Sequence, residues 1–254
     1  MSSTTTPRTG GMSPLLVAAF AIAGGASVGN LYWAQPLLAV IAETFHIPTA
    51  SAGTVVTVTQ LGYAIGALLI IPSGDIVNRR RVIPVLMSLA AIALLMTGLA
   101  PSWPALLAAV AAIGLTTVSG QMLMPLAGDV ATPLQRGRVL SIVASGILLG
   151  LVLARAISGL LAQWLGWRAV FFVAAGIMVV LAVVMARLLP DLPPRERLTY
   201  PTLFVRMLKL LGNPKVRATM VLGVPTMGIF TLFWTALTFL SRARPTTTRS
   251  PPSD

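Results

Sequence analysis

The stretch that decides the fold is Gly62–Val85, which reads GYAIGALLIIPSGDIVNRRRVIPV. It leaves an apolar run, passes through a short polar segment that contains Asp75 and Asn78, and reaches three consecutive arginines at 79–81 before a second apolar run. A group of arginines between two apolar runs is typical of a loop on the cytoplasmic side of a membrane. The stretch therefore predicts two membrane-spanning helices that are joined by a short cytoplasmic loop.

The composition of the whole chain supports the same class of protein. Of its 254 residues, 56% are hydrophobic and only 9% are charged, whereas about 25% of the residues of a soluble domain are charged. The mean hydropathy is +0.88. The apolar runs lack the alternating polar positions of a membrane β-barrel, so helices are the structure that satisfies their backbone in lipid. We expect an all-α, multi-pass membrane protein.

Seven apolar runs are long enough to cross the hydrocarbon core as helices. The predicted spans are 14–41, 51–73, 82–100, 104–127, 139–165, 168–189 and 218–240. The first six predict a transmembrane bundle over 14–189, and the last predicts a seventh transmembrane helix over 218–240. The remaining segments are predicted to be a disordered cytoplasmic tail over 1–13, a cytoplasmic linker with an amphipathic helix over 190–217, and a disordered tail over 241–254.

Positive charge is concentrated in every second loop. Arginines stand at 79–81, at 136 and 138, and at several positions in 187–217, while the loops between them hold few charges. Cytoplasmic loops of membrane proteins carry an excess of lysine and arginine. We therefore expect the amino terminus and these three loops in the cytoplasm, and the protein in the inner (plasma) membrane.

Several function classes are disfavoured by the sequence. The net charge of +12 does not indicate a nucleic-acid partner, because most cations lie at the ends of apolar runs. A single histidine, His46, and the absence of cysteine exclude most metal sites. No P-loop pattern supports an ATP-driven pump, and no convergent carboxylates or nucleophile indicate an enzyme. We expect no metal and no cofactor, with the lipid bilayer and a small-molecule substrate as partners.

Asp75, Asn78 and the arginines Arg79, Arg80 and Arg81 follow the spacing of a known family motif. Their order resembles the signature loop of the major facilitator superfamily, G-x-L-x-D-R-x-G-R-R, with Asp75 at the aspartate and Arg79 and Arg80 at the paired cations. The resemblance implies a gate, in which Asp75 braces helix ends on the cytoplasmic side and releases when two halves of a transporter rock. The alternative is that the three arginines only anchor the topology.

The loop departs from the family pattern at three positions. Ile71 stands at the first glycine, Ile76 stands at the first cation, and Asn78 replaces the second glycine. Asparagine tolerates the left-handed backbone conformation better than most residues. We therefore expect Asn78 to replace that glycine in a tight turn.

Asp129, Arg136 and Arg138 form a second loop that resembles the fourth-to-fifth loop of the same superfamily. Asp129 is expected only to cap a helix or to pair with a cation there, without a special role. No Asp or Glu falls in the middle of a span. If the protein is coupled to protons, the carrier is Glu43, Asp75 or Asp129 near a helix end, or it lies beyond residue 254.

The first span contains GGASVGNLYWAQPLL, in which Asn30, Tyr32 and Gln35 interrupt an apolar helix. This stretch resembles the first helix of bacterial drug-efflux-type members of the superfamily. Polar side chains at this depth usually face the interior of a bundle or a cavity. They either line the substrate pathway or provide hydrogen bonds between helices, and the sequence does not decide between these roles.

Arg155 lies in the middle of the fifth predicted span, about ten residues or more from either end. An arginine there costs at least about 2.5 to 3.5 kcal/mol on insertion scales. We expect Arg155 to line the substrate pathway and attract anionic or polar groups; the alternative is a structural arginine bound to helix-end carbonyls. Gly146 and Gly150, with Gly159 further on, resemble the glycine-rich antiporter signature G-x-x-x-G-P-x-x-G-G without its proline, and predict close helix packing.

Three further polar residues lie within predicted spans, namely Gln60 and Tyr63 in the second and Gln121 in the fourth. Gln60 and Gln121 are candidates for the substrate pathway, although packing is the more common role of such residues. Gly62 and Gly66 give the second span a small-residue face that favours close helix packing.

The expected function is that of a secondary transporter, which exports small molecules by alternating access around a site near the membrane midplane. Six helices, a basic linker and a seventh helix resemble the first half of a duplicated transporter and the start of the second. The basic tail after Leu240 opposes the charge pattern of the other loops, which suggests the hypothesis that a frameshift replaced the second half. The alternatives are a natural half-size protein that acts as a dimer and a structural membrane protein that transports nothing.

Overall fold

The computed structural model describes residues 11–190, except for the side chain of Asp75, together with positions 202, 205, 208–210, 212–223, 225 and 229. The chain divides into two compact units, 1–198 and 199–254. The described elements of the first unit are α1 (Pro14–Gly29), η1 (Gln35–Leu37), α2 (Leu38–Phe45), α3 (Thr49–Ala52), α4 (Thr54–Leu69), α5 (Ser73–Ile76), α6 (Arg79–Leu99), α7 (Trp103–Thr116), α8 (Ser119–Val130), α9 (Arg136–Leu165) and α10 (Trp167–Leu188).

Within these described residues, five helical stretches are long and apolar enough to cross a membrane. They are Thr49–Leu69, Arg79–Leu99, Trp103–Val130, Arg136–Leu165 and Trp167–Leu188. Each lies within a few residues of a predicted span. The chain is therefore an all-α membrane protein, as the sequence predicts.

The first predicted span, 14–41, is not one continuous α-helix. It consists of two shorter apolar helices, α1 and α2, with a distorted stretch between them. The cause is Pro36, which has no N–H to donate and whose ring crowds the carbonyl group four residues earlier. Backbone bonds between residues three apart replace the α-helical pattern here, as when the Tyr32 N–H donates to the Gly29 carbonyl at 2.8 Å. The backbone groups thus stay paired while the helix is reshaped.

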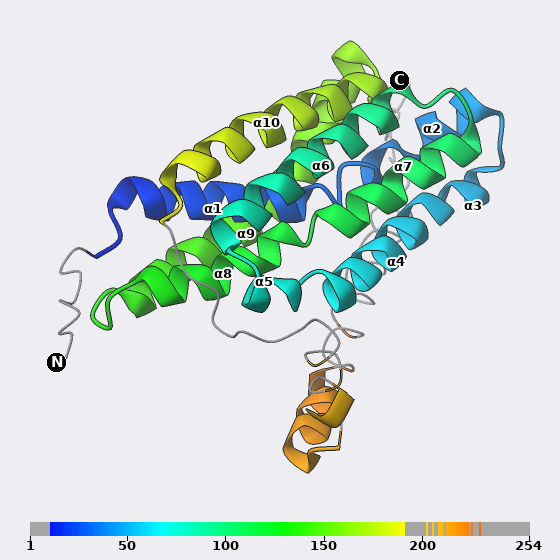
Figure 1. Ribbon diagram of the computed structural model, residues 1–254. Helices are drawn as coiled ribbons and strands as arrows, with labels where there is room; N and C mark the ends of the chain where they lie inside the picture. The colour runs from blue at the N-terminus through cyan, green and yellow to red at the C-terminus, as the bar shows by residue number, and fades with distance from the viewer. Residues whose placement is uncertain are drawn as a thin grey trace, which may run out of the picture. The chain divides into compact units, whose positions relative to one another are not determined.

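The helices of the first unit pack in three principal pairs. Helix α6 lies beside α10, α1 beside α9, and α4 beside α7, and α1 also contacts α8 and α10. Figure 1 shows the long helices of this unit arranged roughly side by side, with α5 at the turn between α4 and α6. Large side chains such as Phe20, Met87 and Phe171 are fully buried between them.

Glycines allow two of these pairs to approach closely. A Cβ atom added at Gly25 or Gly150 would collide with the backbone of the partner helix across the α1–α9 contact. The same is true of Gly146, whose added Cβ would lie 2.6 Å from the Ala21 carbonyl oxygen. Across the α4–α7 contact, Gly62 and Gly66 would collide with the Ala111 and Leu115 carbonyls.

Gly159 is an exception to the packing expectation. An added Cβ at this position would meet no heavy atom of the described residues within 4 Å. The spacing of Gly146, Gly150 and Gly159 on one helix does not place all three on the α1 side, because the α-helix turns about 100° per residue. The prediction of close helix packing is therefore wrong for Gly159, although this residue follows the glycine motif in the sequence.

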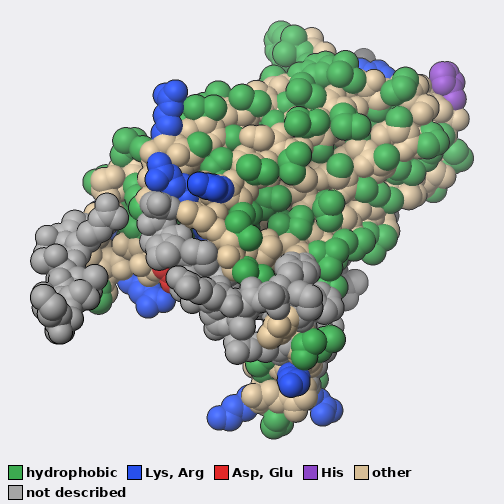
Figure 2. Space-filling model, in the orientation of Figure 1, with side chains coloured by type: hydrophobic (Ala, Val, Ile, Leu, Met, Phe, Trp, Pro, Cys, Tyr) green, Lys and Arg blue, Asp and Glu red, His purple; other side chains and the backbone are tan. Residues whose placement is uncertain are grey.

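The two ends of the first unit differ in character. One end, here called the basic end, carries the arginines at 79–81, 136 and 138, which stand where α6 and α9 begin. At the opposite end, the rings of Phe45, Trp103 and Trp167 pack together, with centroids 6.1 Å apart in the Phe45–Trp103 and Phe45–Trp167 pairs. Figure 2 shows a largely hydrophobic face over the helices, with Lys and Arg gathered mainly toward the basic end.

Several predicted segments lie wholly or partly outside the described residues. These are most of the tail over 1–13, most of the linker over 190–217, the second part of the seventh helix over 218–240, and the tail over 241–254. In the second unit, residues 214–223 are helical. Asn213 precedes this helix, and its side-chain oxygen accepts a hydrogen bond from the Lys215 N–H at 3.0 Å.

We predict that Gly150→Ala destabilises the bundle, because the added methyl group meets the Gly25 backbone rather than a movable side chain. Overpacking of this kind costs about 1 to 3 kcal/mol. The matched control is Gly159→Ala in the same helix, where the space is open and the better helix propensity of alanine contributes up to about 1 kcal/mol. Thermal unfolding of the purified chain in detergent should show a lower Tm for the first variant only. Equal Tm values for the two variants would contradict the close α1–α9 contact.

Candidate functional site

The turn at the basic end is built around the start of α6. The side-chain oxygen of Asn78 accepts a hydrogen bond from the Arg80 N–H at 2.9 Å, so Asn78 is the N-cap of α6. Its φ is −60° and its ψ is 111°. Asn78 therefore does not adopt the left-handed conformation that asparagine tolerates. An extended residue whose side chain caps the first turn satisfies a helix N–H that has no backbone partner.

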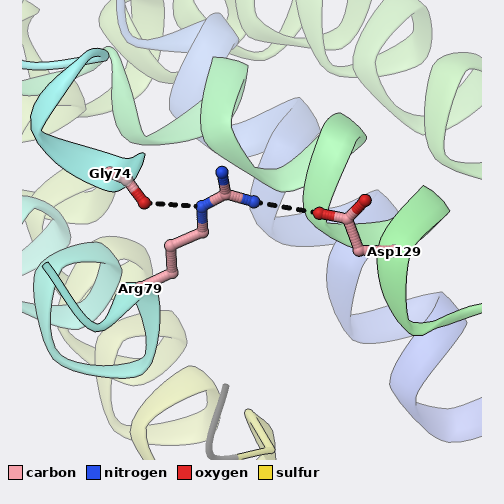
Figure 3. Close-up of polar contacts among 3 residues, drawn as sticks. All are labelled: Gly74, Arg79 and Asp129. Carbon is pink, nitrogen blue, oxygen red and sulfur yellow. Dashed lines mark hydrogen bonds and ion pairs between the residues drawn. The ribbon is translucent and has the colours of Figure 1, made fainter. Parts of the chain in front are cut away.

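Arg79 connects three elements at this end (Figure 3). Its Nε–H donates to the Gly74 carbonyl of α5 at 2.8 Å, and its Nη1 donates to the Asp129 Oδ2 of α8 at 3.0 Å. The side chains of Arg79 and Asp129 are only 12% and 23% exposed, respectively. The neighbouring Arg80 and Arg81 are exposed. Asp75 lies in α5, directly after Gly74.

Asp129 is the partner of Arg79 in α8, and the sequence predicts such a pair. The prediction that it pairs with a cation is confirmed, and the arginine that it binds also donates to the Gly74 carbonyl of α5. The available signal was its place near the end of a span, at the same end as a loop rich in arginine. We name the arrangement of Gly74, Arg79 and Asp129 the basic-end latch.

A second group of polar side chains surrounds Arg155. The Arg155 Nε–H donates to Gln35 Oε1 at 3.0 Å, and its Nη1 donates to the Leu151 carbonyl at 3.2 Å. The guanidinium carbon lies 4.1 Å from the centroid of the Tyr32 ring, a distance typical of a cation–π contact. Tyr32, Gln35 and Arg155 are all partly buried. The structure thus joins the distorted stretch after α1 to the middle of α9.

Gln121 and Tyr63 form a second pair of polar side chains. The Gln121 Nε2 donates to the Tyr63 hydroxyl oxygen at 2.6 Å, which links α8 to α4. We name the five residues Tyr32, Gln35, Tyr63, Gln121 and Arg155 the polar cluster.

Two of the predicted pathway residues do not join the polar cluster. Asn30 is buried, and its Oδ1 accepts a hydrogen bond from the Trp33 Nε1 at 3.1 Å. The Ser158 hydroxyl, which the sequence interpretation did not single out, donates to the Trp33 carbonyl at 2.6 Å. Asn30 lies apart from the polar cluster and lines an apolar groove between α1, α9 and α10. Gln60 lies on α4 with an exposed side chain.

The opposite flank of the α1–α9 contact forms an apolar groove of about 700 Å³ between α1, α9 and α10. Ala154 packs on Gly29 of α1. Leu153, one position before Ala154, lines the groove, whereas Arg155, one position after it, belongs to the polar cluster. Successive residues of an α-helix differ in direction by about 100°. The cluster and the groove therefore lie on different sides of the contact.

The geometry defines what each feature can do. The polar cluster places a cation, amide groups and phenol hydroxyls among membrane-spanning helices, which suits the binding of a polar or anionic group. In the basic-end latch, Arg79 of α6 forms an ion pair with Asp129 of α8 and donates a hydrogen bond to the Gly74 carbonyl of α5. Such a junction can hold two helix ends together and release them without any change in covalent bonds.

Relatives of this chain are named as transporters. It is 40% identical over 235 residues to the uncharacterized transporter YgaY of Escherichia coli O157:H7, a match that covers 92% of this chain and 60% of the relative. It is 33% identical over 235 residues to a probable transporter of Streptomyces coelicolor, with 91% and 54% covered. A probable sugar efflux transporter of Helicobacter pylori (strain ATCC 700392 / 26695) is 26% identical over 172 residues, with 67% and 44% covered.

The chain spans about 60% of the length of the Escherichia coli relatives that it matches. The family model described as "Major Facilitator Superfamily" matches residues 15–248. This range includes all of the helices α1 to α10 except Pro14, the first residue of α1. This match agrees with the all-helical membrane fold and with the transporter names of the relatives. The chain therefore belongs to the Major Facilitator Superfamily.

Proposed function

We propose that this chain forms one helical bundle of a secondary transporter that exports small molecules by alternating access. The observation that carries the proposal is the polar cluster, because Arg155 is partly buried among membrane-spanning helices and contacts Gln35 and Tyr32. Ionisable residues within membrane spans usually mark a substrate or ion pathway. In this proposal the protein lies in the inner membrane, and its amino terminus and basic end face the cytoplasm.

The basic-end latch is proposed to act as the cytoplasmic gate. When Arg79 binds both Gly74 and Asp129, the short helix α5 is held against α8. Breaking the ion pair would free the loop between α4 and α6 as the bundle tilts. Asp75 is proposed to contribute to the same gate because it lies in α5, next to Gly74.

Alternating access needs a second bundle on the other side of the substrate site. The relatives are longer than this chain, so we propose that the second bundle is either a further segment or a second copy. The alternative is a structural membrane protein that moves no substrate. The direction of transport, efflux, is supported by relatives that are named probable sugar efflux transporters. Drug-type substrates and coupling to protons are further parts of the proposal.

Transport by the reconstituted 254-residue chain tests the requirement for a second bundle. In proteoliposomes with a pH gradient, we predict near-background movement of added compounds when each vesicle holds one chain, because one bundle supplies one wall of the site. Transport by paired copies should rise with the square of the protein-to-lipid ratio. Strong transport at one chain per vesicle would contradict the two-bundle proposal. No transport at any ratio would exclude a second copy as the second bundle.

The gate is tested by a cysteine-accessibility measurement, which the absence of native cysteine permits. Met122 is buried in α8 and would contact a side chain added at Gly74 of α5. We predict that Met122→Cys reacts faster with a water-soluble maleimide when Asp129→Asn removes the ion pair. A partly exposed pair is worth about 1 kcal/mol, which corresponds to a change of about fivefold in a two-state equilibrium.

The control for this measurement is Arg80→Gln, which removes an exposed arginine next to Arg79 and leaves the latch intact. The labelling rate of Met122→Cys should not change in that background. If Met122→Cys is labelled at the same rate with and without Asp129→Asn, the Arg79–Asp129 pair does not hold α5 against α8.

A further inference from the structure

We propose that the basic end binds an anionic phospholipid on the exposed face of the α6–α10 pair. Arg81 of α6 and Arg187 of α10 hold the phosphate of the headgroup, and the acyl chains lie along the apolar faces of the same two helices. The proposal goes beyond the transport function and does not depend on it, because this surface includes no residue of the polar cluster or of the basic-end latch.

One face of α6 is exposed along the helix and begins with Arg81. Its exposed residues recur three or four positions apart, which places them on the same side of an α-helix. Apart from a single serine, the residues of this face after Arg81 are apolar; they are Val85, Ser88, Leu89, Ile92, Leu95, Met96 and Leu99. Lipid tails are as apolar as leucine, so this face suits contact with acyl chains.

Helix α10 has a matching face that ends with Arg187. Counting back from this arginine, the exposed residues three or four positions apart are Val183, Val180, Gly176 and Val173. The helix from Arg187 to Gly176 is about 17 Å long at a rise of about 1.5 Å per residue, and so is the helix from Arg81 to Ile92. Half of a hydrocarbon core that is about 30 Å thick is about 15 Å. Each apolar face is therefore long enough to extend through one leaflet.

The two arginines lie at a similar depth, because α6 and α10 pack side by side (Figure 1) and run in opposite directions. Near the start of α10, Arg168 donates to the carbonyl group that follows the last residue of α6, at 3.3 Å. Phe172 of α10 packs on Gly98 of α6, where an added Cβ would lie 2.7 Å from the ring. Because both helices rise by the same distance per residue, counting from these contacts places Arg187 within about one helical turn of Arg81.

The charge of this surface favours an anionic partner. Both arginine side chains are exposed, and neither forms an ion pair within the part of the chain that the structure describes. Of the carboxylates described there, Asp129 is bound to Arg79, and Glu43 lies in α2 near the aromatic rings of the opposite end. A guanidinium binds phosphate oxygens through paired N–H donors. The complementary group is therefore the phosphate of a headgroup that carries net negative charge.

A phospholipid fits this surface better than a soluble phosphate compound does. A soluble anion would use only the arginines, whereas a phospholipid would also cover the apolar faces that continue from them. Each lysine or arginine near an anionic membrane surface raises the affinity about fivefold. Phosphatidylcholine has a phosphate but also a choline cation, which the arginines repel. The surface should therefore discriminate between an anionic and a zwitterionic phospholipid.

The test compares phosphatidylglycerol with phosphatidylcholine of identical acyl chains. The full 254-residue chain is titrated in detergent with each lipid, and native mass spectrometry counts the bound molecules. We expect the first phosphatidylglycerol to bind at least about tenfold more tightly than the first phosphatidylcholine, because two arginines contribute about fivefold each. Equal affinities would overturn the proposal. Displacement of the lipid by soluble glycerol 3-phosphate at a similar concentration would also overturn it, because the acyl chains would then contribute nothing.

Variants then assign the binding to the two arginines. Arg81→Gln and Arg187→Gln should each weaken the first phosphatidylglycerol about fivefold, and the double variant should lose the preference. Arg81→Lys should retain part of it, because the charge remains while the planar fork is lost. The matched control is Arg138→Gln, which removes an exposed arginine of α9 at the same end. All of these side chains are exposed, so each variant should fold, which thermal unfolding checks. An equal loss in Arg138→Gln, or no loss in the double variant, would overturn the assignment.

Discussion

The constraint on which the whole structure depends is that lipid offers no hydrogen bonds to the backbone. Long apolar helices satisfy that constraint without help, and they account for most of the described chain. The stretch between α1 and α2 is the instructive case, because Pro36 prevents a regular α-helix there. Bonds such as Leu37 N–H to the Ala34 carbonyl at 3.0 Å keep the backbone paired. The same reshaping presents Tyr32 and Gln35 to α9, so a backbone requirement creates the place where the polar cluster forms.

The close contact between α1 and α9 organises what lies on either side of it. Gly25, Gly146 and Gly150 let the two backbones touch, and little space remains for side chains along that line. Long polar side chains on α9 must therefore point to one flank or the other. Arg155 points to the flank of Gln35 and Tyr32, while the groove on the other flank is almost entirely apolar. The glycines thus contribute to the site although none of them would contact a substrate.

The sequence predicted the helices well, because length and apolar composition decide whether a segment can span a membrane. It also singled out Arg155 as a functional candidate, since placing a cation within a span costs free energy whichever side of the helix carries it. It could not predict which polar residues meet. Asn30, Gln60 and Gln121 look alike in sequence, and only the rotation of each helix places Gln121 on Tyr63 and buries Asn30 against Trp33.

Helix α8 connects the two features that the proposed function uses. It carries Gln121, which binds Tyr63 in the polar cluster, and Asp129, which binds Arg79 in the latch. The two residues are eight positions apart, or about 12 Å along the axis, and Pro125 lies between them inside the helix. A proline removes one backbone hydrogen bond and favours a bend at that point. Because α8 carries both residues, a movement of α8 at Asp129 would also displace Gln121. A bend at Pro125 would reduce the part of this movement that reaches Gln121.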